Sequence, residues 1–243
     1  MGEIIVEIKD LSKKYRKSSE YAIKHINLEC RAGEIVGLIG KNGAGKSTTI
    51  KCLTGFFAFD EGKIKICGYD IVKDELKAKS QIGYVPDNHA LFEKMTGYEY
   101  IKFIGEIHKI DEQTRNQRIE EMEQVFHLGP AINQLISTYS HGMKQKVCIM
   151  ASLIHEPKLW LLDEPLTGLD PQTSLALRKY MEKYKNKNNT VLYSSHNLDA
   201  VEKTCDRAYI ISNGTIVENI DVKKFKTEHP QKSLEDAFME LFA

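Results

Sequence analysis

The sequence has no excess of charge of either sign and no long apolar run. Lysine plus arginine and aspartate plus glutamate each total 34 of the 243 residues, so the formal net charge is zero. A protein that holds a nucleic-acid backbone or an anionic membrane surface by bulk electrostatics needs a basic excess, which this chain lacks. No window approaches the roughly 20 apolar residues that a membrane-spanning helix requires. If the protein acts at a membrane, we expect another chain to cross it.

Paired cysteines and a secretory leader are also lacking. The N-terminal stretch MGEIIVEIKD has neither the basic region nor the apolar region of a signal peptide. Five cysteines are scattered along the chain, and none shows the CxxC spacing of a zinc or redox site. We expect all of them to be buried free thiols in a reducing cytosol. They are Cys30, Cys52, Cys67, Cys148 and Cys205.

What the sequence does contain is a strand-rich first third followed by a helical middle. The expected strands are short apolar runs separated by turn residues, and they lie at 4–8, 23–30, 34–39 and 63–67. A short helix is expected from Lys46 to about Gly55. Between about 88 and 157 the spacing is helical, with a capping-box pattern, TGYE, that begins at Thr96. The last helix of this stretch places one apolar face at Met143, Val147, Met150, Ala151 and Ile154.

An α/β pattern returns after Pro157. The expected elements are a buried-type strand, a helix capped by Asp170, a second strand and a hairpin that turns at Asn213-Gly214, and they lie at 159–162, 171–184, 190–194 and 207–218. The residues from 221 to 243 form a short polar tail that ends in a helix. The sequence therefore predicts a single α/β domain interrupted by helices.

Residues 40–48 read GKNGAGKST and match the phosphate-loop pattern G-x-x-x-x-G-K-[ST]. Glycines let main-chain N–H groups turn inward around a phosphate, and the following helix points its positive end at the same anion. Lys46 is expected to reach the β- and γ-phosphates, Ser47 to bind Mg²⁺, and Thr48 to reach the α-phosphate side. The other nucleotide-binding positions of the loop are Gly40, Lys41, Asn42, Gly43, Ala44 and Gly45.

Two adjacent acids, Asp163 and Glu164, end the apolar strand LWLL. Neighbouring carboxylates at the end of a buried strand cost free energy unless a cation or a reaction needs them. Alone, the pair could equally be two solvated acids at a strand end. Beside a phosphate loop, we assign Asp163 to Mg²⁺, through water, and Glu164 to polarising the attacking water.

Over about residues 3–220 the chain resembles the nucleotide-binding subunit of ATP-binding cassette (ABC) transporters. Besides the phosphate loop and the acids, four elements match that family in order. Tyr15 stands where the family has an aromatic that stacks on adenine, and YSHGMKQ at 139–145 stands at its signature. Leu169-Asp170 resembles the D-loop. His196 resembles the switch histidine that contacts the γ-phosphate, although a lone histidine at a strand end is more often structural.

The sequence departs from the family pattern at two places. In the signature, His141 replaces a glycine, and Tyr139 and Met143 replace leucine and glutamine, whereas Ser140 and Gly142 are kept. Ser140 also fits a helix N-cap, and the amides of an N-cap form an anion site in either case. The second departure is Asp87, which stands where the family has glutamine. We expect its carboxylate to reach Mg²⁺ or a metal-bound water.

The resemblance implies an α/β fold: a P-loop NTPase core with a mixed sheet, an N-terminal antiparallel β-subdomain and a helical signature subdomain at about 88–157. The nucleotide-binding domain would span 1–220, with the tail at 221–243. The resemblance also implies an ATPase that uses ATP and Mg²⁺. Two such subunits, identical or diverged, pair head to tail, so that Ser140, His141, Gly142 and Met143 close over the ATP of the partner.

The implied partners are integral membrane subunits, which ATP-driven dimerisation would energise. The protein would then be cytoplasmic, on the inner face of the cell membrane, and the signature variant and short tail favour an exporter. The main alternative is a soluble ABC-type ATPase that acts on nucleic acid or ribosomes. A single cassette, no heptad run and no net charge disfavour it. A non-hydrolysing nucleotide sensor is a weaker alternative, against which Glu164 and His196 argue.

Overall fold

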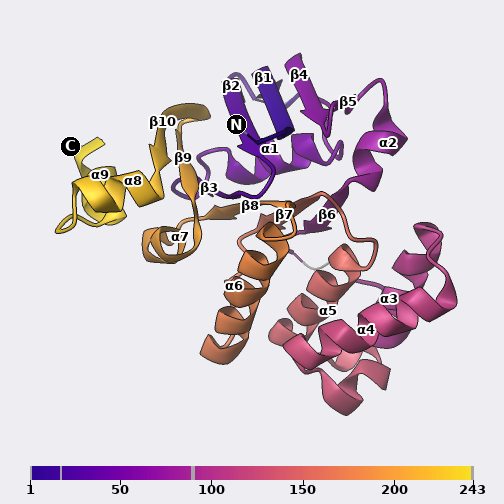
Figure 1. Ribbon diagram of the computed structural model, residues 1–243. Helices are drawn as coiled ribbons and strands as arrows, with labels where there is room; N and C mark the ends of the chain where they lie inside the picture. Colours follow the sequence, from indigo (N-terminus) through magenta and orange to yellow (C-terminus); the bar gives the residue numbers. More distant parts are fainter. Residues whose placement is uncertain (1, 17, 89–90, 242–243) are drawn as a thin grey trace.

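The strands of the protein form two sheets, seen in the computed structural model of Figure 1, which describes residues 2–16, 18–88 and 91–241. The antiparallel sheet has the order β2-β1-β4-β5. Its strands are β1 (Ile4–Lys14), β2 (Tyr21–Arg31), β4 (Glu61–Ile66) and β5 (Tyr69–Asp70). The second sheet has the order β10-β9-β3-β8-β7-β6. Its strands are β3 (Ile35–Ile39), β6 (Ile82–Val85), β7 (Leu159–Asp163), β8 (Thr190–Ser195), β9 (Arg207–Ser212) and β10 (Thr215–Asp221).

The second sheet is mixed, because β10 pairs antiparallel with β9 while the other neighbours are parallel. The helices are α1 (Lys46–Leu53), α2 (Glu75–Ser80), α3 (Gly97–Ile107), α4 (Glu112–Phe126), α5 (His141–Leu153), α6 (Pro171–Lys185), α7 (Leu198–Thr204), α8 (Val222–Glu228) and α9 (Leu234–Leu241), with 3-10 turns at Gly129–Asn133 and Ile136–Thr138. In Figure 1, α1 lies between the two sheets, and α3, α4 and α5 form a separate helical layer. The predicted fold class is confirmed.

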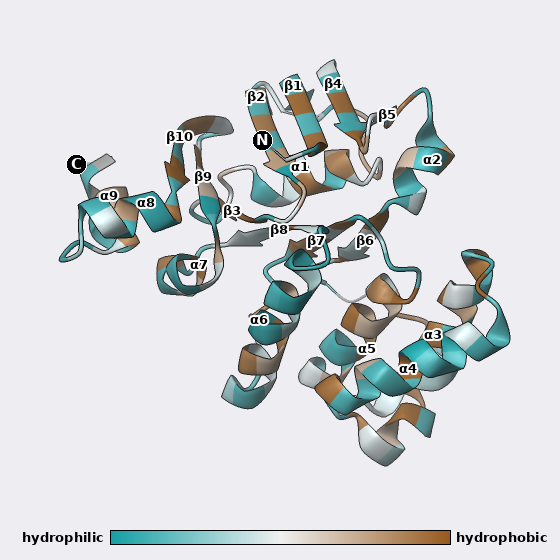
Figure 2. Cartoon of the chain, in the orientation of Figure 1, coloured by the Kyte–Doolittle hydropathy of each residue, from teal (hydrophilic) through white to brown (hydrophobic). Residues whose placement is uncertain are grey.

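Two hydrophobic cores lie on opposite faces of the mixed sheet. Because successive side chains of a strand point to opposite faces, each central strand contributes to both. In β7, Trp160 and Leu162 pack in the core shared with the helical layer, whereas Leu159 and Leu161 pack in the core shared with the antiparallel sheet. Burial on both faces explains why the central strands read as continuous apolar runs. The outer faces of helices such as α4 are hydrophilic (Figure 2).

Several local predictions are confirmed. Thr96 and Glu99 form the reciprocal capping box at the start of α3, with N–H to oxygen distances of 3.1 and 2.8 Å. The hairpin turns at Asn213 and Gly214, with φ of 46° and 75°, as a type I′ turn requires. On α5 and its C-cap, the expected apolar face packs in the core with the helical layer: Met143, Val147, Met150, Ala151 and Ile154. The strands β5 and β6 and the helices α2, α7 and α8 were not predicted.

The prediction that all five cysteines are buried is wrong for Cys67, which is half-buried. It follows β4 and has a left-handed φ of 50°, at the turn into β5. All five are free thiols. Burial raises the pKa of the Cys52 and Cys67 thiols to about 11, so both stay protonated at neutral pH and are poor nucleophiles.

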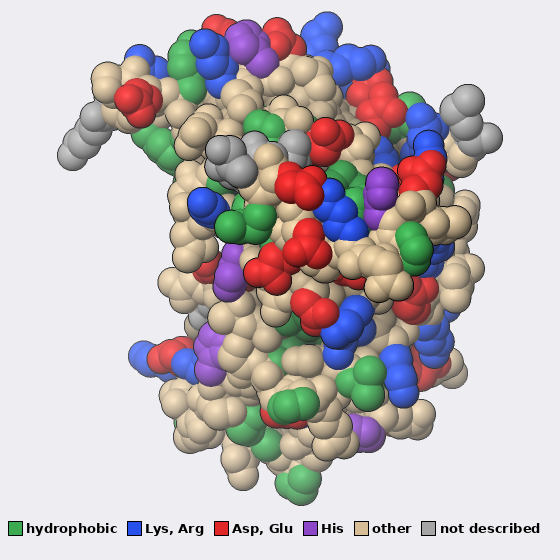
Figure 3. All heavy atoms as spheres, turned by 90° about the vertical axis from the view of Figure 1, so that its left-hand side faces the viewer, with side chains coloured by type: hydrophobic (Ala, Val, Ile, Leu, Met, Phe, Trp, Pro, Cys, Tyr) green, Lys and Arg blue, Asp and Glu red, His purple; other side chains and the backbone are tan. Residues whose placement is uncertain are grey.

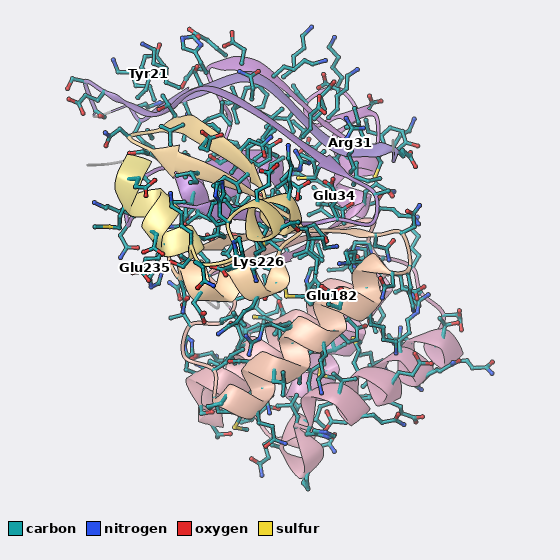
Figure 4. The ribbon with its side chains drawn as sticks, turned by 60° about the vertical axis from the view of Figure 1, so that its left-hand side comes forward. Tyr21, Arg31, Glu34, Glu182, Lys226 and Glu235 are labelled. Atoms are coloured by element: carbon teal, nitrogen blue, oxygen red, sulfur yellow. The ribbon has the colours of Figure 1, made fainter. Side chains whose placement is uncertain are left out.

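The C-terminal segment is packed on the domain. Val222, Leu234 and Phe238 belong to the same core as the helical layer. The Leu234 N–H donates to Glu202 Oε2 of α7 at 2.8 Å, and Lys226 lies 3.5 Å from the other oxygen of Glu202. Figure 4 shows Lys226 on α8 and Glu235 on α9 at this end of the molecule. The predicted tail at 221–243, of which 242–243 lie outside the described residues, is thus attached to the helix that follows His196.

Charged side chains of both signs are interspersed over the face shown in Figure 3. This agrees with the zero net charge. Within the part of the chain that the structure describes, no helix is long and apolar enough to span a bilayer.

Two histidines stack in the groove between β6 and the helical layer. The rings of His108 and His155 are 3.7 Å apart between centroids, with an interplanar angle of 11°. His155 also contacts the Ile82 carbonyl oxygen at 3.1 Å. Burial, together with the charges of His108 and Arg118, lowers the pKa of His155 to about 4, and the hydrogen bond with the Ile82 carbonyl oxygen opposes this shift. Arg118 itself is paired with Glu156 at 2.5 Å.

Acidification should therefore destabilise the fold. Above pH 6.5, His155 is neutral both folded and unfolded and contributes nothing. Between pH 6.5 and about 4, only the unfolded chain binds the proton, so the free energy of unfolding should fall, by roughly 2 kcal/mol at pH 5. Urea unfolding at pH 7.5 and pH 5 measures this. His155→Gln should remove most of the fall and the exposed His229→Gln should not; an unchanged fall in His155→Gln contradicts the assignment.

Candidate functional site

The phosphate loop joins β3 to α1. Gly45, with a φ of 113°, is the N-cap of α1. The Lys46 ammonium is buried and donates to the carbonyl oxygens of Gly40 and Lys41 at 2.7 and 3.3 Å. A Cβ on Gly40 would lie 2.4 Å from the Ile211 carbonyl oxygen. At Gly40, the backbone of β9 therefore leaves no room for a side chain.

Asp163 lies at the carboxyl end of β7 and is 1% exposed. Its Oδ1 accepts hydrogen bonds from Ser47 Oγ at 3.1 Å and from Ser194 Oγ at 2.6 Å. Burial raises the pKa of Asp163, and the nearby charges of Asp87 and Glu164 add to that effect, against the two hydrogen bonds. A cation at this position would offset both the burial and the repulsion.

The donors around Asp163 suit Mg²⁺. Ser47, Asp163 and Asp87 offer hydroxyl and carboxylate oxygens, the ligands that hard cations prefer. Among the described residues, no group of three or more His, Cys, Asp or Glu side chains is arranged to hold a metal. Mg²⁺ usually takes only one or two carboxylates and completes its shell with phosphates and water. The donor set therefore fits a metal that arrives with a nucleotide and does not form an independent cage.

Glu164 follows the strand and has a φ of 50°, an unusual backbone conformation for a non-glycine residue. Its N–H donates to Ser194 Oγ at 3.1 Å. One carboxylate oxygen lies 3.4 Å from the Lys46 ammonium, and the other lies 3.0 Å from His196 Nδ1. The structure thus brings Glu164 and His196 together, with the carboxylate held between the phosphate-loop lysine and the imidazole.

An open pocket of about 450 Å³ lies over these groups. Tyr15 lies at its rim, with its hydroxyl 3.0 Å from Thr48 Oγ1 and its ring edge-on to Phe57 at 5.8 Å. Tyr15 is 40% exposed, so a planar ligand can reach its ring. The residues that line the pocket are Tyr15, Ala22, Asn42, Gly43, Gly45, Lys46, Ser47, Thr48, Asp87 and Glu164.

The signature residues are not among those that line this pocket. Ser140 is the N-cap of α5 and accepts from the Met143 N–H at 3.3 Å. Asp170 is likewise an N-cap, for α6, and accepts from the Thr173 N–H and hydroxyl at 2.9 and 2.6 Å. The described chain therefore assembles the phosphate loop, Tyr15 and the acids into one site, whereas Ser140, His141, Gly142, Met143 and Asp170 lie elsewhere.

Three residues that support this site through contacts with its members were not predicted from the sequence. Ser194 bonds both Asp163 and the following amide, and two serines at the end of a buried strand were a signal for it. The Gln145 amide donates to the Pro165 carbonyl oxygen at 3.1 Å. Phe57, in the loop that follows α1, packs against Tyr15. Only the tertiary structure shows these last two.

Comparisons with known proteins agree with one another. The family model described as ABC transporter matches residues 23–167. The linearmycin resistance ATP-binding protein LnrL of Bacillus subtilis is 35% identical over 213 residues, covering 88% of this chain and 68% of that protein. The ABC transporter ATP-binding protein NatA of the same organism is 31% identical over 216 residues, 88% of each. A solved ATP-binding subunit of an ABC transporter superimposes with a TM-score of 0.91 at 32% identity, covering 98% of this chain and 100% of that one.

Proposed function

This chain belongs to the ABC transporter family, as one of its ATP-binding and ATP-hydrolysing subunits, and we propose roles for its residues in that activity. The observation that carries the proposal is the meeting of Lys46, Glu164 and His196 beside the phosphate loop. The Lys46 ammonium lies 3.4 Å from Glu164, and His196 lies 3.0 Å from the same carboxylate. A cation that can bind a phosphate, Lys46, and a carboxylate that can polarise a water molecule, Glu164, are thus adjacent.

The phosphate loop binds the triphosphate of ATP. Main-chain N–H groups from Gly40 to Ser47 surround the β-phosphate, and the N-terminus of α1 points at it. Lys46 turns its ammonium from Glu164 to the β- and γ-phosphates. Tyr15, supported by Phe57, offers its ring face to the adenine. Thr48 positions the Tyr15 hydroxyl and lies on the α-phosphate side.

Ser47 and Asp163 hold the Mg²⁺ of Mg-ATP, with Asp87 beside them. Bound there, the ion would neutralise charge on the transferred phosphate. The residues themselves are prepared for a cation: Ser47 and Ser194 orient Asp163 at 3.1 and 2.6 Å, and burial raises the pKa of Asp163.

Glu164 polarises the water that attacks the γ-phosphate. The geometry supports this role because three groups fix the residue, namely the Ser194 hydroxyl, Lys46 and His196. His196 contacts the carboxylate through Nδ1, and its side chain is 54% exposed, so we assign it the contact with the γ-phosphate. A positioned acid and its orienting partner are the usual arrangement for general-base chemistry.

The missing side of the site comes from a second ABC subunit. Ser140, His141, Gly142 and Met143 lie at the N-terminus of α5, where the positive end of the helix favours an anion, and they are not among the residues that line the pocket of their own chain. A head-to-tail pair brings them over the ATP of the partner, with Asp170 at the contact between the subunits. ATP binding closes this pair and hydrolysis reopens it.

Integral membrane subunits carry the transported substrate, and this protein drives them from the inner face of the cell membrane. Its relative LnrL is named for resistance to linearmycin, which favours export over import. The names of the relatives favour a transporter over an ATPase that acts on nucleic acid.

Mixing two inactive variants tests the shared site. Lys46→Ala disables the phosphate loop, and Ser140→Arg blocks the signature; each alone should abolish ATP hydrolysis. A mixed pair contains one intact site and one doubly damaged site. An equal mixture should therefore recover about a quarter of the wild-type rate if pairing is random and the sites are independent.

The control is a mixture of Lys46→Ala with Ser47→Ala. Both changes lie in the phosphate loop, so every site in the mixture has a damaged loop and no ATP hydrolysis should be recovered. A Lys46→Ala and Ser140→Arg mixture that stays as inactive as its components would show that each site is built within one subunit.

A further inference from the structure

The signature helix is attached to the loop that follows Glu164 through two side chains. His141 is the first residue of α5, and Gln145 lies one turn later on the same face. Gln145 is 2% exposed, and its amide donates to the Pro165 carbonyl oxygen at 3.1 Å. Pro165 is the residue directly after Glu164. The first turn of α5 thus touches the chain next to the water-polarising acid.

The second attachment is the imidazole of His141 against Gly168. A Cβ on Gly168 would lie 2.6 Å from His141 Cδ2 and 2.8 Å from Nε2. The ring therefore occupies the space that any larger side chain at 168 would need. Gly168 has a φ of 74°, so it turns the chain toward Leu169 and Asp170. His141 and Gln145 together hold both ends of the segment 165–168.

That segment lies between two functional groups. It follows Glu164, which is contacted on its other side by Ser194 and His196, and it precedes Leu169 and Asp170, the N-cap of α6. Within it, the Thr167 N–H donates to the Glu164 carbonyl oxygen at 3.2 Å. The first turn of α5 is therefore connected to the backbone of Glu164 through a short, hydrogen-bonded turn.

We propose that the imidazole of His141 is a positioning group for Glu164 of its own subunit. The inference rests on the proposed function, in which the main chain at 140–143 faces the ATP of the partner. The main chain of His141 would contact that ATP while the imidazole of the same residue packs against 165–168. Closure over one nucleotide then sets the orientation of the acid that serves the other.

The hypothesis separates hydrolysis from ATP-driven pairing. His141→Ala should keep the main-chain amides that face the partner's ATP but lose the contact with Gly168. We expect its kcat to fall about threefold to tenfold with KM changed less than twofold, since small misplacements of reacting groups affect chemistry strongly. In a Glu164→Gln background, adding His141→Ala should leave the ATP concentration needed for dimer formation unchanged in size-exclusion chromatography.

The steric contact gives a second, independent readout. Gly168→Ala should lower kcat because its methyl group meets the imidazole and because alanine is strained at a φ of 74°. Removing the imidazole in the His141→Ala, Gly168→Ala double variant should raise kcat above that of Gly168→Ala alone. His229→Ala, an identical exchange at an exposed position on the far side of the domain, is the matched control and should keep wild-type kcat. Thermal unfolding of each variant checks that the fold is intact.

Three results would overturn the proposal. The first two are a wild-type kcat in His141→Ala and a double variant no faster than Gly168→Ala. The third is a requirement for more than about ten times the ATP to form the dimer when His141→Ala is added to Glu164→Gln, which would place the imidazole on the nucleotide itself. If Glu164→Gln alone fails to dimerise with ATP, the proposed function falls first, and this inference falls with it.

Discussion

Replacing Glu164 with glutamine should trap the ATP-bound dimer and slow hydrolysis by about 10²- to 10⁴-fold, the contribution typical of a general base. Glutamine has the size of glutamate and keeps an oxygen for His196, whose ring lies 3.0 Å from the carboxylate. It loses the charge that polarises water. ATP should still bind, because Lys46 and the loop amides are untouched. Single-turnover hydrolysis and size-exclusion chromatography with ATP measure the two effects.

The matched control is Glu228→Gln on α8, an exposed glutamate that should keep the wild-type rate. A Glu164→Gln variant that hydrolyses ATP normally would contradict the role given to Glu164, even if it still formed a dimer. Slow hydrolysis without a stable dimer would instead indicate that the exchange disturbs the Lys46 and His196 contacts.

Removing the Lys46 side chain should weaken Mg-ATP binding about 30- to 150-fold. Lys46 is 5% exposed, and its ammonium donates to the Gly40 carbonyl oxygen at 2.7 Å. The ammonium is thus held close to the proposed position of the ATP phosphates. Charge-assisted hydrogen bonds contribute about 2–3 kcal/mol when both partners are desolvated, which gives this range of affinity. Equilibrium titration of Lys46→Ala with a fluorescent ATP analogue and Mg²⁺ measures it, and hydrolysis should be lost at cellular ATP concentrations.

Lys203→Ala, which removes an exposed lysine paired with Asp199, should bind nucleotide like the wild type. Wild-type affinity in Lys46→Ala would remove the basis of the whole site, because the phosphate loop would then not be the place where ATP binds. Lys46→Arg is a further test, since a planar guanidinium does not reproduce the compact charge of an ammonium.

The short-range parts of the site could be predicted from the sequence, because their geometry is local. The phosphate loop needs only a strand, nine residues and a helix, and the capping box at Thr96 and the Asn213-Gly214 turn depend on neighbours a few residues apart. Asp163 and Glu164 were proposed as site residues because two acids at the end of an apolar strand are unusual. Each of these predictions depends on residues close in sequence.

The long-range contacts could not be predicted, because they depend on the register of the sheet and the packing of helices. Ser194 meets Asp163 because these two residues are partners in the parallel pairing of β7 with β8. A shift of one residue would have turned the hydroxyl to the other face. The contact of His141 with Gly168 depends on how α5 packs beside the loop after β7. In both cases the residue types were visible, but their pairing was not.

The double-sided burial of β7 has a consequence for how the two acids are positioned. Trp160 and Leu162 anchor the strand in one core, and Leu159 and Leu161 anchor it in the other, so Asp163 is the last residue of a segment restrained from both sides. Glu164 is the first residue beyond that restraint, and its left-handed backbone turns the chain into 165–168. Its carboxylate is positioned by the side chains that contact it, Lys46 and His196, and not by either core. Two acids adjacent in sequence therefore owe their positions to different parts of the molecule: Asp163 to the packing of the sheet, Glu164 to polar contacts at the site.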